Sequence, residues 1–444
     1  MPQFTRNPPE LPIVLRHFGV AEAVDSESVR HHIEITANMR REKLMRRAER
    51  VCAFWWVLGL LLVAVPAMGQ GDWEPVVGDT AMMGNGFGDL DNEAAGAMAV
   101  FDGRLYVVAG GDSGQACQLW RTANGVDWEH VLPDGFGDAN NQGSAAMIEF
   151  DGYLYVGTSN LNGAQIHRSD DGVAWSAVVV DGLWNVDNRA ITVFAEHAGE
   201  LFAGTENETD GGEIWRTGNG TNWSFPLIGG FGDVSNRAIA SLASFDGMLY
   251  AGTFRESPLY NQPGDIFWTD DLQTWFQNAT DPFADPYNVA MSAMSVHDGM
   301  LYVGTTQLNP ILGSGCEVWR TDGGMWTIAA VNGFGSSLSM GILRFEEYFG
   351  ELYAAVAQPD PDLVPGGTGA KIMRFVAPLN WSAEVPDGFG DTDNWAIGSM
   401  AAFNGTFYAG TVNTSEGCEV WRNDIVFFDG FESGDTGGWS GSLP

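Results

Sequence analysis

Paired acidic residues at two places in the sequence have a spacing that could serve a metal ion. Asp89 and Asp91 form one pair, Asp391 and Asp393 form the other, and each pair stands directly before an asparagine. Oxygen ligands at alternate loop positions can wrap Ca²⁺, although the glycine and distal glutamate of an EF-hand loop are absent here. The same carboxylates could instead cap their own turns. The sequence therefore requires no cofactor, with calcium as the alternative.

A second candidate set directly follows an asparagine that recurs along the chain and is replaced by Ser339 in one repeat. The residues at this position vary in charge and size while their neighbours do not: Glu93, Gln142, Arg189, Arg237, Val289, Met340 and Trp395. Arg189 and Arg237 could hold an anionic ligand opposite Trp395. Alternatively, each arginine forms an ion pair with a loop carboxylate such as that of Asp187 or Asp233.

The longest loops expected between strands cover residues 254–264, 306–315 and 358–369. Phe254, Arg255 and Tyr260 give the first of them aromatic and cationic groups that its equivalents lack. Exposed aromatic rings beside an arginine suit a carbohydrate or peptide ligand. Packing of these loops on one another is the alternative interpretation.

Signatures of the common hydrolases and nucleotide-binding sites are missing from the sequence. There is no Gly-x-Ser-x-Gly, no His-Glu-x-x-His and no phosphate loop. Acidic pairs such as Glu346 with Glu347 could serve glycoside hydrolysis, but sequence alone does not give the separation of two carboxylates. We therefore expect a binding or scaffold protein, with a glycoside hydrolase or lyase on the same scaffold as the alternative.

These candidates are positioned by a repeat of about fifty residues, and the repeat occurs seven times. A turn glycine stands eleven residues after each recurring Asn or Ser, as Gly103, Gly152, Gly199, Gly247, Gly299, Gly350 and Gly405. A period of this length is typical of propellers. A group that recurs in every repeat usually stabilises a structure that all the repeats share. The recurring asparagines, called the asparagine lattice below, are therefore expected to be structural.

Four short strand patterns can be read in each repeat, which predicts an all-β, seven-bladed β-propeller of four-stranded antiparallel blades. A tryptophan opens the fourth strand of the first six repeats, as at Trp128, but none follows the seventh repeat. The missing copy is Trp73, near the other end of the chain. The first strand is therefore expected to complete the last blade and close the ring, which removes an exposed edge.

The turns before these tryptophans resemble a known hairpin. They read Ser169-Asp170-Asp171-Gly172-Val173-Ala174-Trp175 and Thr217-Gly218-Asn219-Gly220-Thr221-Asn222-Trp223. They are similar to the Asp-box, or BNR, hairpin of sialidases and other β-propellers, here one residue shorter and often with Asn for Asp. The resemblance implies a sialidase-superfamily-like architecture, although the Phe/Tyr-Arg-Ile-Pro signature of sialidases is missing. In that family the box is a structural turn on the face away from the active site.

The ends of the chain point to export. Residues 1–38 are expected to be an over-extended start, and residues 39–69 a Sec-type signal peptide with a basic segment, a short apolar run and a small-residue cleavage site. The propeller should cover residues 70–424, followed by an acidic Gly/Ser-rich tail at 425–444 that resembles tails of exported bacterial proteins. Three cysteines of the mature chain, Cys117, Cys316 and Cys418, share one repeat position, so they should be free and buried.

A net charge of −36 excludes nucleic acid and anionic membranes as natural partners. We expect a secreted, surface or periplasmic monomer that is not inserted in a membrane after signal cleavage and that binds a carbohydrate or a protein. The candidate ligand-binding residues are Glu93, Gln142, Arg189, Arg237, Trp395, Phe254, Arg255 and Tyr260.

Overall fold

A computed structural model describes residues 73–423, apart from residues 112–113, 132, 228, 256–261, 279–284, 309–312 and 362–365. The chain divides into two units, Met1–Met68 and Gly69–Pro444, and all described residues belong to the second. The expected signal peptide, the tail and Tyr260 lie outside the described residues. Within the described ranges, no helix is long and apolar enough to cross a membrane.

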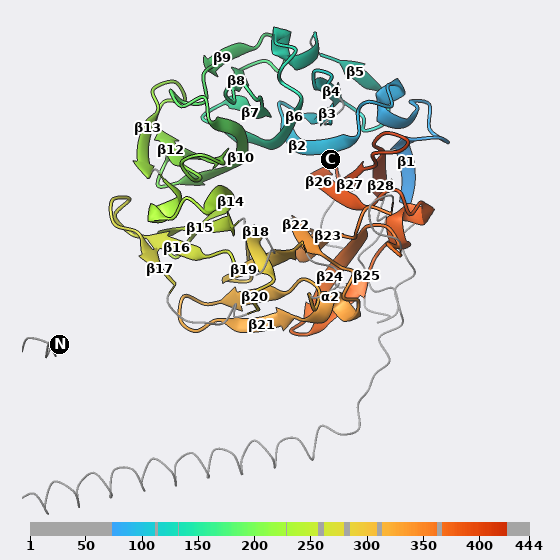
Figure 1. Cartoon of the computed structure of the whole chain (residues 1–444). Helices are drawn as coiled ribbons and strands as arrows, with labels where there is room; N and C mark the ends of the chain where they lie inside the picture. The colour runs from blue at the N-terminus through green and yellow to red at the C-terminus, as the bar shows by residue number, and fades with distance from the viewer. Residues whose placement is uncertain are drawn as a thin grey trace, which may run out of the picture. The chain divides into compact units, whose positions relative to one another are not determined.

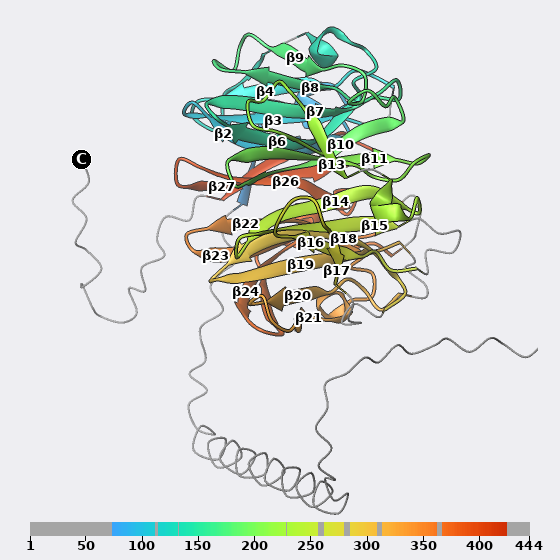
Figure 2. The same ribbon diagram turned by 90° about the vertical axis from the view of Figure 1, so that its left-hand side faces the viewer.

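Each sequence repeat folds into short strands that surround a common axis (Figures 1 and 2). The strands nearest the axis are β2 (Ala94–Phe101), β6 (Gly143–Phe150), β10 (Asn188–His197), β14 (Asn236–Phe245), β18 (Asn288–His297), β22 (Gly341–Tyr348) and β26 (Ala396–Phe403). Each pairs antiparallel with the next strand of its repeat. These second strands are β3 (Arg104–Gly110), β7 (Tyr153–Ser159), β11 (Glu200–Asn207), β15 (Met248–Arg255), β19 (Met300–Gln307), β23 (Glu351–Ala357) and β27 (Thr406–Val412).

Two further sets of strands lie outside these pairs. The third strands are β4 (Gln118–Thr122), β8 (Ile166–Ser169), β12 (Ile214–Thr217), β16 (Ile266–Thr269), β20 (Val318–Thr321), β24 (Lys371–Ala377) and β28 (Val420–Asn423). The outermost strands are β5 (Trp128–His130), β9 (Ser176–Val179), β13 (Ser224–Leu227), β17 (Phe276–Gln277), β21 (Thr327–Ala330), β25 (Asn380–Ala383) and β1 (Trp73–Val77), of which β1 pairs with β28. The prediction of an all-β propeller is confirmed in this arrangement.

Tight Gly-Phe-Gly turns lead into the inner strands: η1 (Asn85–Gly88), η2 (Asp134–Gly137), η3 (Gly230–Gly232), α2 (Asn332–Gly335) and η4 (Asp387–Gly390). The phenylalanine of such a turn packs its ring among the aromatic residues of the outer strands. Phe87, for example, stacks on Trp120 of β4 at 4.9 Å and meets Trp128 of β5 edge-on at 5.5 Å. These contacts fasten the outer strands to the turn and so fix where each inner strand begins.

A buried polar network repeats where the inner strands begin. Asn188 is fully buried, and its Nδ2 donates to the Gly182 carbonyl at 2.8 Å and to Glu213 Oε2 at 2.6 Å. Its Oδ1 accepts hydrogen bonds from Thr205 Oγ1 and Asn207 Nδ2, both at 3.0 Å. Related bonds are made by Asn92, Asn141, Asn288 and Asn394. These groups satisfy one another, which supports the structural interpretation of the lattice.

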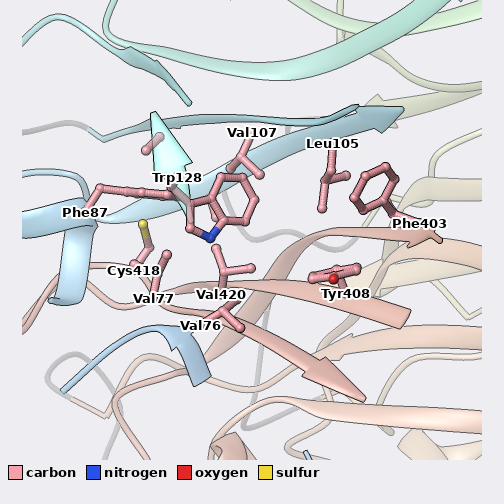
Figure 3. Packing of buried hydrophobic residues seen from close by; sticks show 13 residues of the cluster. Val76, Val77, Phe87, Leu105, Val107, Trp128, Phe403, Tyr408, Cys418 and Val420 are labelled. Atoms are coloured by element: carbon pink, nitrogen blue, oxygen red, sulfur yellow. The ribbon is translucent and has the colours of Figure 1, made fainter. Parts of the chain in front are cut away.

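Apolar side chains fill the space between neighbouring sets of strands. In one such cluster Leu105 and Val107 of β3 pack with Tyr408 of β27 and Val420 of β28 (Figure 3). Cys418 lies in the same cluster, and the predicted free, buried thiols Cys117, Cys316 and Cys418 are confirmed. Burial raises the pKa of the Cys117 thiol to about 12 and that of the other two still further, so the thiols are inert at neutral pH.

Candidate functional site

A cavity of about 660 Å³ lies on the axis of the ring of strands. Its wall includes the fourth residue after the recurring Asn or Ser in every inner strand: Gly96, Ala145, Thr192, Ala240, Ser292, Leu343 and Gly398. The strand register shifts next to this position, as between Ile191 and Val193 in β10. Such a bulge re-aims the backbone. Most of these wall side chains are small, which leaves the axis open.

One end of the cavity carries polar and charged groups where the inner strands begin. Gln142, Asn160, Arg189, Glu206 and Glu208 line it there. The Arg189 Nη1 lies 3.5 Å from Glu208 Oε2. This end, defined by these five residues and Phe254, is called the mouth below.

Arg237 neutralises much of the acidic charge at the mouth. Its Nη2 donates to Glu206 Oε1 at 2.8 Å and also contacts Glu208. Its guanidinium lies 5.6 Å from the centre of the Phe254 ring, within cation–π range. The carboxylate partners of Arg189 and Arg237 are therefore glutamates of the β11 segment. Asp233, one of the loop aspartates named as an alternative partner for these arginines, bonds Arg255.

The other predicted ligand-binding residues fall into distinct environments. Gln142, Arg189 and Phe254 line the cavity, whereas Glu93, Arg237 and Trp395 are not among its lining residues. Several residues of the predicted ring share one backbone role, since the carbonyls of Glu93, Gln142, Arg189 and Trp395 accept amide hydrogen bonds from the loops after the second strands. Their role as ligand contacts stays a prediction.

Arg255, although next to Phe254, is held by side chains of its own repeat. Its guanidinium bonds Asp233 and lies 3.3 Å from Asp265 Oδ2, and its Nε donates to Gln262 Oε1 at 3.1 Å. With three such partners the charge of Arg255 fixes the loop.

The paired aspartates make the turn contacts expected of capping residues. Asp89 Oδ1 accepts from the Asp91 amide at 3.2 Å, and Asp391 Oδ1 accepts from the Asp393 amide at 3.0 Å. Asp391 Oδ2 also accepts from Asn413 Nδ2 at 3.2 Å. In the part of the chain that is described, no group of three or more His, Cys, Asp or Glu side chains is placed to hold a metal ion. The calcium hypothesis stays a prediction.

A second cavity of about 320 Å³ contains Arg344, which the sequence analysis did not select as a site, and Glu346, which it named only as part of an acidic pair. Arg344 lines both cavities, and Glu346 lines the second. Both lie on β22, five and seven residues after Ser339. The equivalent residues elsewhere are apolar, small or serine: Ala97, Ala146, Val193, Ser241, Ala293 and Ser399 for Arg344, and Ala99, Ile148, Ala195, Ala243, Ser295 and Ala401 for Glu346. A comparison of the repeats at these positions would have found them.

Glu346 should make the stability of the fold depend on pH. Burial raises its pKa from the ordinary 4.5 to about 7. The folded chain therefore holds this proton more tightly than the unfolded chain, and the stabilisation is complete below about pH 4.5 and lost as the pH rises through about 7. We expect Glu346→Gln to raise the free energy of unfolding at pH 8 by about 3 kcal/mol, with a much smaller change at pH 5.

Urea unfolding at the two pH values measures this difference. Glu149→Gln is the matched control because Glu149 is an exposed glutamate on the inner strand β6. Equal free energies of unfolding for Glu346→Gln and the wild type at both pH values would contradict the expectation. They would mean that ionisation of Glu346 at pH 8 does not destabilise the folded protein.

An exposed aromatic residue lies in a turn that is bonded to a segment of the mouth. Trp184 is 76% exposed and has a φ of 64°, a conformation that non-glycine residues rarely adopt. The equivalent turn residues are Gly88, Gly137, Gly232, Gly335 and Gly390. Gly182, two residues before Trp184, donates its amide to the Ala164 carbonyl at 3.0 Å. This bond joins the turn to the loop of Leu161, a residue that lines the cavity and is 70% exposed.

Comparisons with known proteins identify a family. The model of a family described as a DUF6242 beta propeller domain matches residues 80–331. None of the curated proteins matches the sequence. Similar solved structures include the Penicillium chrysogenum α-L-arabinanase complexed with arabinobiose, which is 14% identical with a TM-score of 0.41, over 63% of this chain and 92% of that chain.

Two further structures are similar at the same level. The GH93 α-L-arabinofuranosidase of Fusarium graminearum with arabinobiose is 15% identical with a TM-score of 0.39, over 62% of this chain and 91% of that one. A luciferin-regenerating enzyme is 11% identical with a TM-score of 0.41, over 63% and 90%. Likenesses of this strength carry no argument about activity.

Proposed function

Since the chain belongs to the family of the DUF6242 β-propeller domain, we propose that its propeller is an exported binding protein that holds a carbohydrate at the mouth of the axial cavity. The observation that carries the proposal is the cavity of about 660 Å³, a volume within the range of small-molecule sites. Export itself rests on the signal-peptide pattern of residues 39–69.

The chemistry of the mouth supports a sugar. Sugars present hydroxyl groups around an apolar ring face, so they need donors, acceptors and an aromatic or aliphatic surface together. Gln142 offers an amide, Glu206 and Glu208 offer acceptors, and Phe254 offers a ring. Trp184 adds an exposed indole in the neighbouring turn, on which a longer saccharide could stack.

A glycan array followed by isothermal titration of each hit tests the proposal. We expect Gln142→Ala to weaken binding of a sugar hit about tenfold, because the substitution removes two amide donors and an acceptor from the mouth. Gln273→Ala is the matched control, since Gln273 is exposed and does not line the cavity. Equal affinities of wild type and Gln142→Ala for every hit would place binding elsewhere, and an array without hits would contradict the proposal.

A carbohydrate-active enzyme on the same scaffold is the second candidate. Glu346 favours it, because a carboxyl with a pKa of about 7 can act as a general acid near neutral pH. A glycosidase also needs a second carboxylate at a suitable separation. Glu206 and Glu208 both bond Arg237, which suits binding better than proton transfer. Product analysis of any bound oligosaccharide distinguishes turnover from binding alone.

We also propose that the propeller has seven blades and that β1 closes the ring. The supporting observations are the pairing of Trp73 with Asn423 and of Glu74 with Arg422. Trp73 meets Phe389 edge-on at 5.3 Å, as Trp128 meets Phe87. The Asp-box-like turns are proposed as structural hairpins, since Asn219 Oδ1 accepts the amides of Thr221 at 3.0 Å and Asn222 at 2.8 Å.

A further inference from the structure

The donors inside the axial cavity are unequally available to a ligand. Thr192 Oγ1 donates to the Ile239 carbonyl at 2.6 Å, and Ser292 Oγ donates to the Ile342 carbonyl at 2.8 Å. These hydroxyl groups are therefore used in joining neighbouring repeats. Two arginines line the cavity, Arg189 and Arg344. Arg189 belongs to the mouth, whereas Arg344 lies further along its inner strand.

Arg344 reaches across the axis instead of pairing with an acid. Its Nη2 donates to the Ala145 carbonyl of β6, and its Nη1 lies 3.5 Å from the Leu343 carbonyl. Among the described residues, no ion pair joins Arg344 to a carboxylate, whereas Arg189, Arg237 and Arg255 all have such partners. A guanidinium has five N–H donors, so two carbonyl acceptors leave N–H groups of Arg344 that can donate to a ligand.

Within the described part of the chain, no carboxylate therefore neutralises the charge of Arg344. Desolvation lowers its pKa from the ordinary value, and no carboxylate offsets that effect. A guanidinium nevertheless stays protonated at neutral pH. A positive charge in this position is stabilised by an anion that enters the cavity, and a carboxylate fits the planar guanidinium best.

We propose that Arg344 recognises a carboxylate, so that the saccharide held at the mouth is an acidic sugar of the uronic acid type whose carboxylate points down the axis. This inference rests on the proposed carbohydrate function and specifies its ligand class. The net charge of −36 disfavours long polyanions, which favours a single acidic residue or a short oligosaccharide over an acidic polymer.

Isothermal titration with a matched pair of sugars tests the inference. The probes are D-galacturonate and D-galactose, with acetate as a carboxylate that lacks a sugar ring. The variants are Arg344→Ala, which introduces the residue that three other repeats carry at this position, and Arg344→Lys, which keeps the charge. Arg104→Ala is the control, because Arg104 does not line either cavity. Melting temperatures confirm that each variant is folded.

We expect wild type to bind galacturonate at least tenfold more tightly than galactose, with Arg344→Ala losing that preference and Arg344→Lys keeping part of it. Equal affinities of wild type for the two sugars would overturn the carboxylate inference and leave the carbohydrate function standing. Arg344-dependent binding of acetate without binding of either sugar would keep the carboxylate site and overturn the carbohydrate function. Binding of none of the three probes would overturn both.

Discussion

Asn188→Ala is expected to lower the free energy of unfolding by about 3–5 kcal/mol, because the substitution opens a buried polar network. Asn188 bonds the Gly182 carbonyl, Glu213, Thr205 and Asn207, and it is fully buried. Alanine removes all four bonds at once. Glu213 is itself only 5% exposed, so loss of this donor leaves a buried carboxylate with Asn185 and Trp215 as its side-chain donors. Urea unfolding followed by tryptophan fluorescence measures the change.

A double-mutant cycle separates the network from simple loss of volume. Glu213→Gln removes the buried charge, so Asn188→Ala should cost less in that background than in the wild type. Asn222→Ala is the matched control, because Asn222 is exposed in an outer turn, and a change within about 0.5 kcal/mol is expected there. Additive effects of Asn188→Ala and Glu213→Gln would show that the two side chains act independently, against the expectation.

Removal of β1 is expected to lower the melting temperature by more than roughly 10 °C, because it uncovers β28 and part of two apolar clusters. Val77 is fully buried and Val76 is 5% exposed in the cluster of Figure 3. Trp73 packs on the opposite side, against Phe389 and Phe407 at 5.3 and 5.7 Å. Burial of these side chains contributes several kcal/mol, on the order of 25 cal/mol per Å² of apolar surface.

Two chains that differ only in β1 make the comparison, one beginning at residue 70 and the other at residue 79. Differential scanning calorimetry gives the two melting temperatures. Trp73→Ala in the longer chain should lower the free energy of unfolding by about 3 kcal/mol and give an intermediate melting temperature. A synthetic peptide of residues 70–79 should restore part of the lost stability by adding a strand to β28. Equal melting temperatures of the two chains would refute ring closure by β1.

The repeat made much of the architecture predictable. The inner strands begin at or within two residues of the recurring Asn or Ser, as at Asn188 and Gly341, so they follow the period that the sequence shows. The burial of Cys117, Cys316 and Cys418 followed from their shared repeat position. These features depend on contacts within one repeat or with the next, and such contacts recur with the period of the sequence.

Charged partners at the mouth were less predictable. The alternative that each arginine forms an ion pair with a carboxylate applies to Arg189 and Arg237, and among the described residues the carboxylates paired with them are those of Glu206 and Glu208. An ion pair is chosen by side-chain reach and by the direction of the strand ends, which spacing along the chain does not encode. The role of Tyr260 stays a prediction.

The sequence by itself determined the all-β repeat, the position of its turns and the buried asparagine lattice, because each of these depends on the local pattern of one repeat. Only the tertiary structure decided which side chains meet on the axis. Arg344 and the Ala145 carbonyl are 199 residues apart in the chain, and they meet because their inner strands lie across the axis from each other. A contact of that kind exists only when the strands of distant repeats surround one axis, so no local pattern could reveal it.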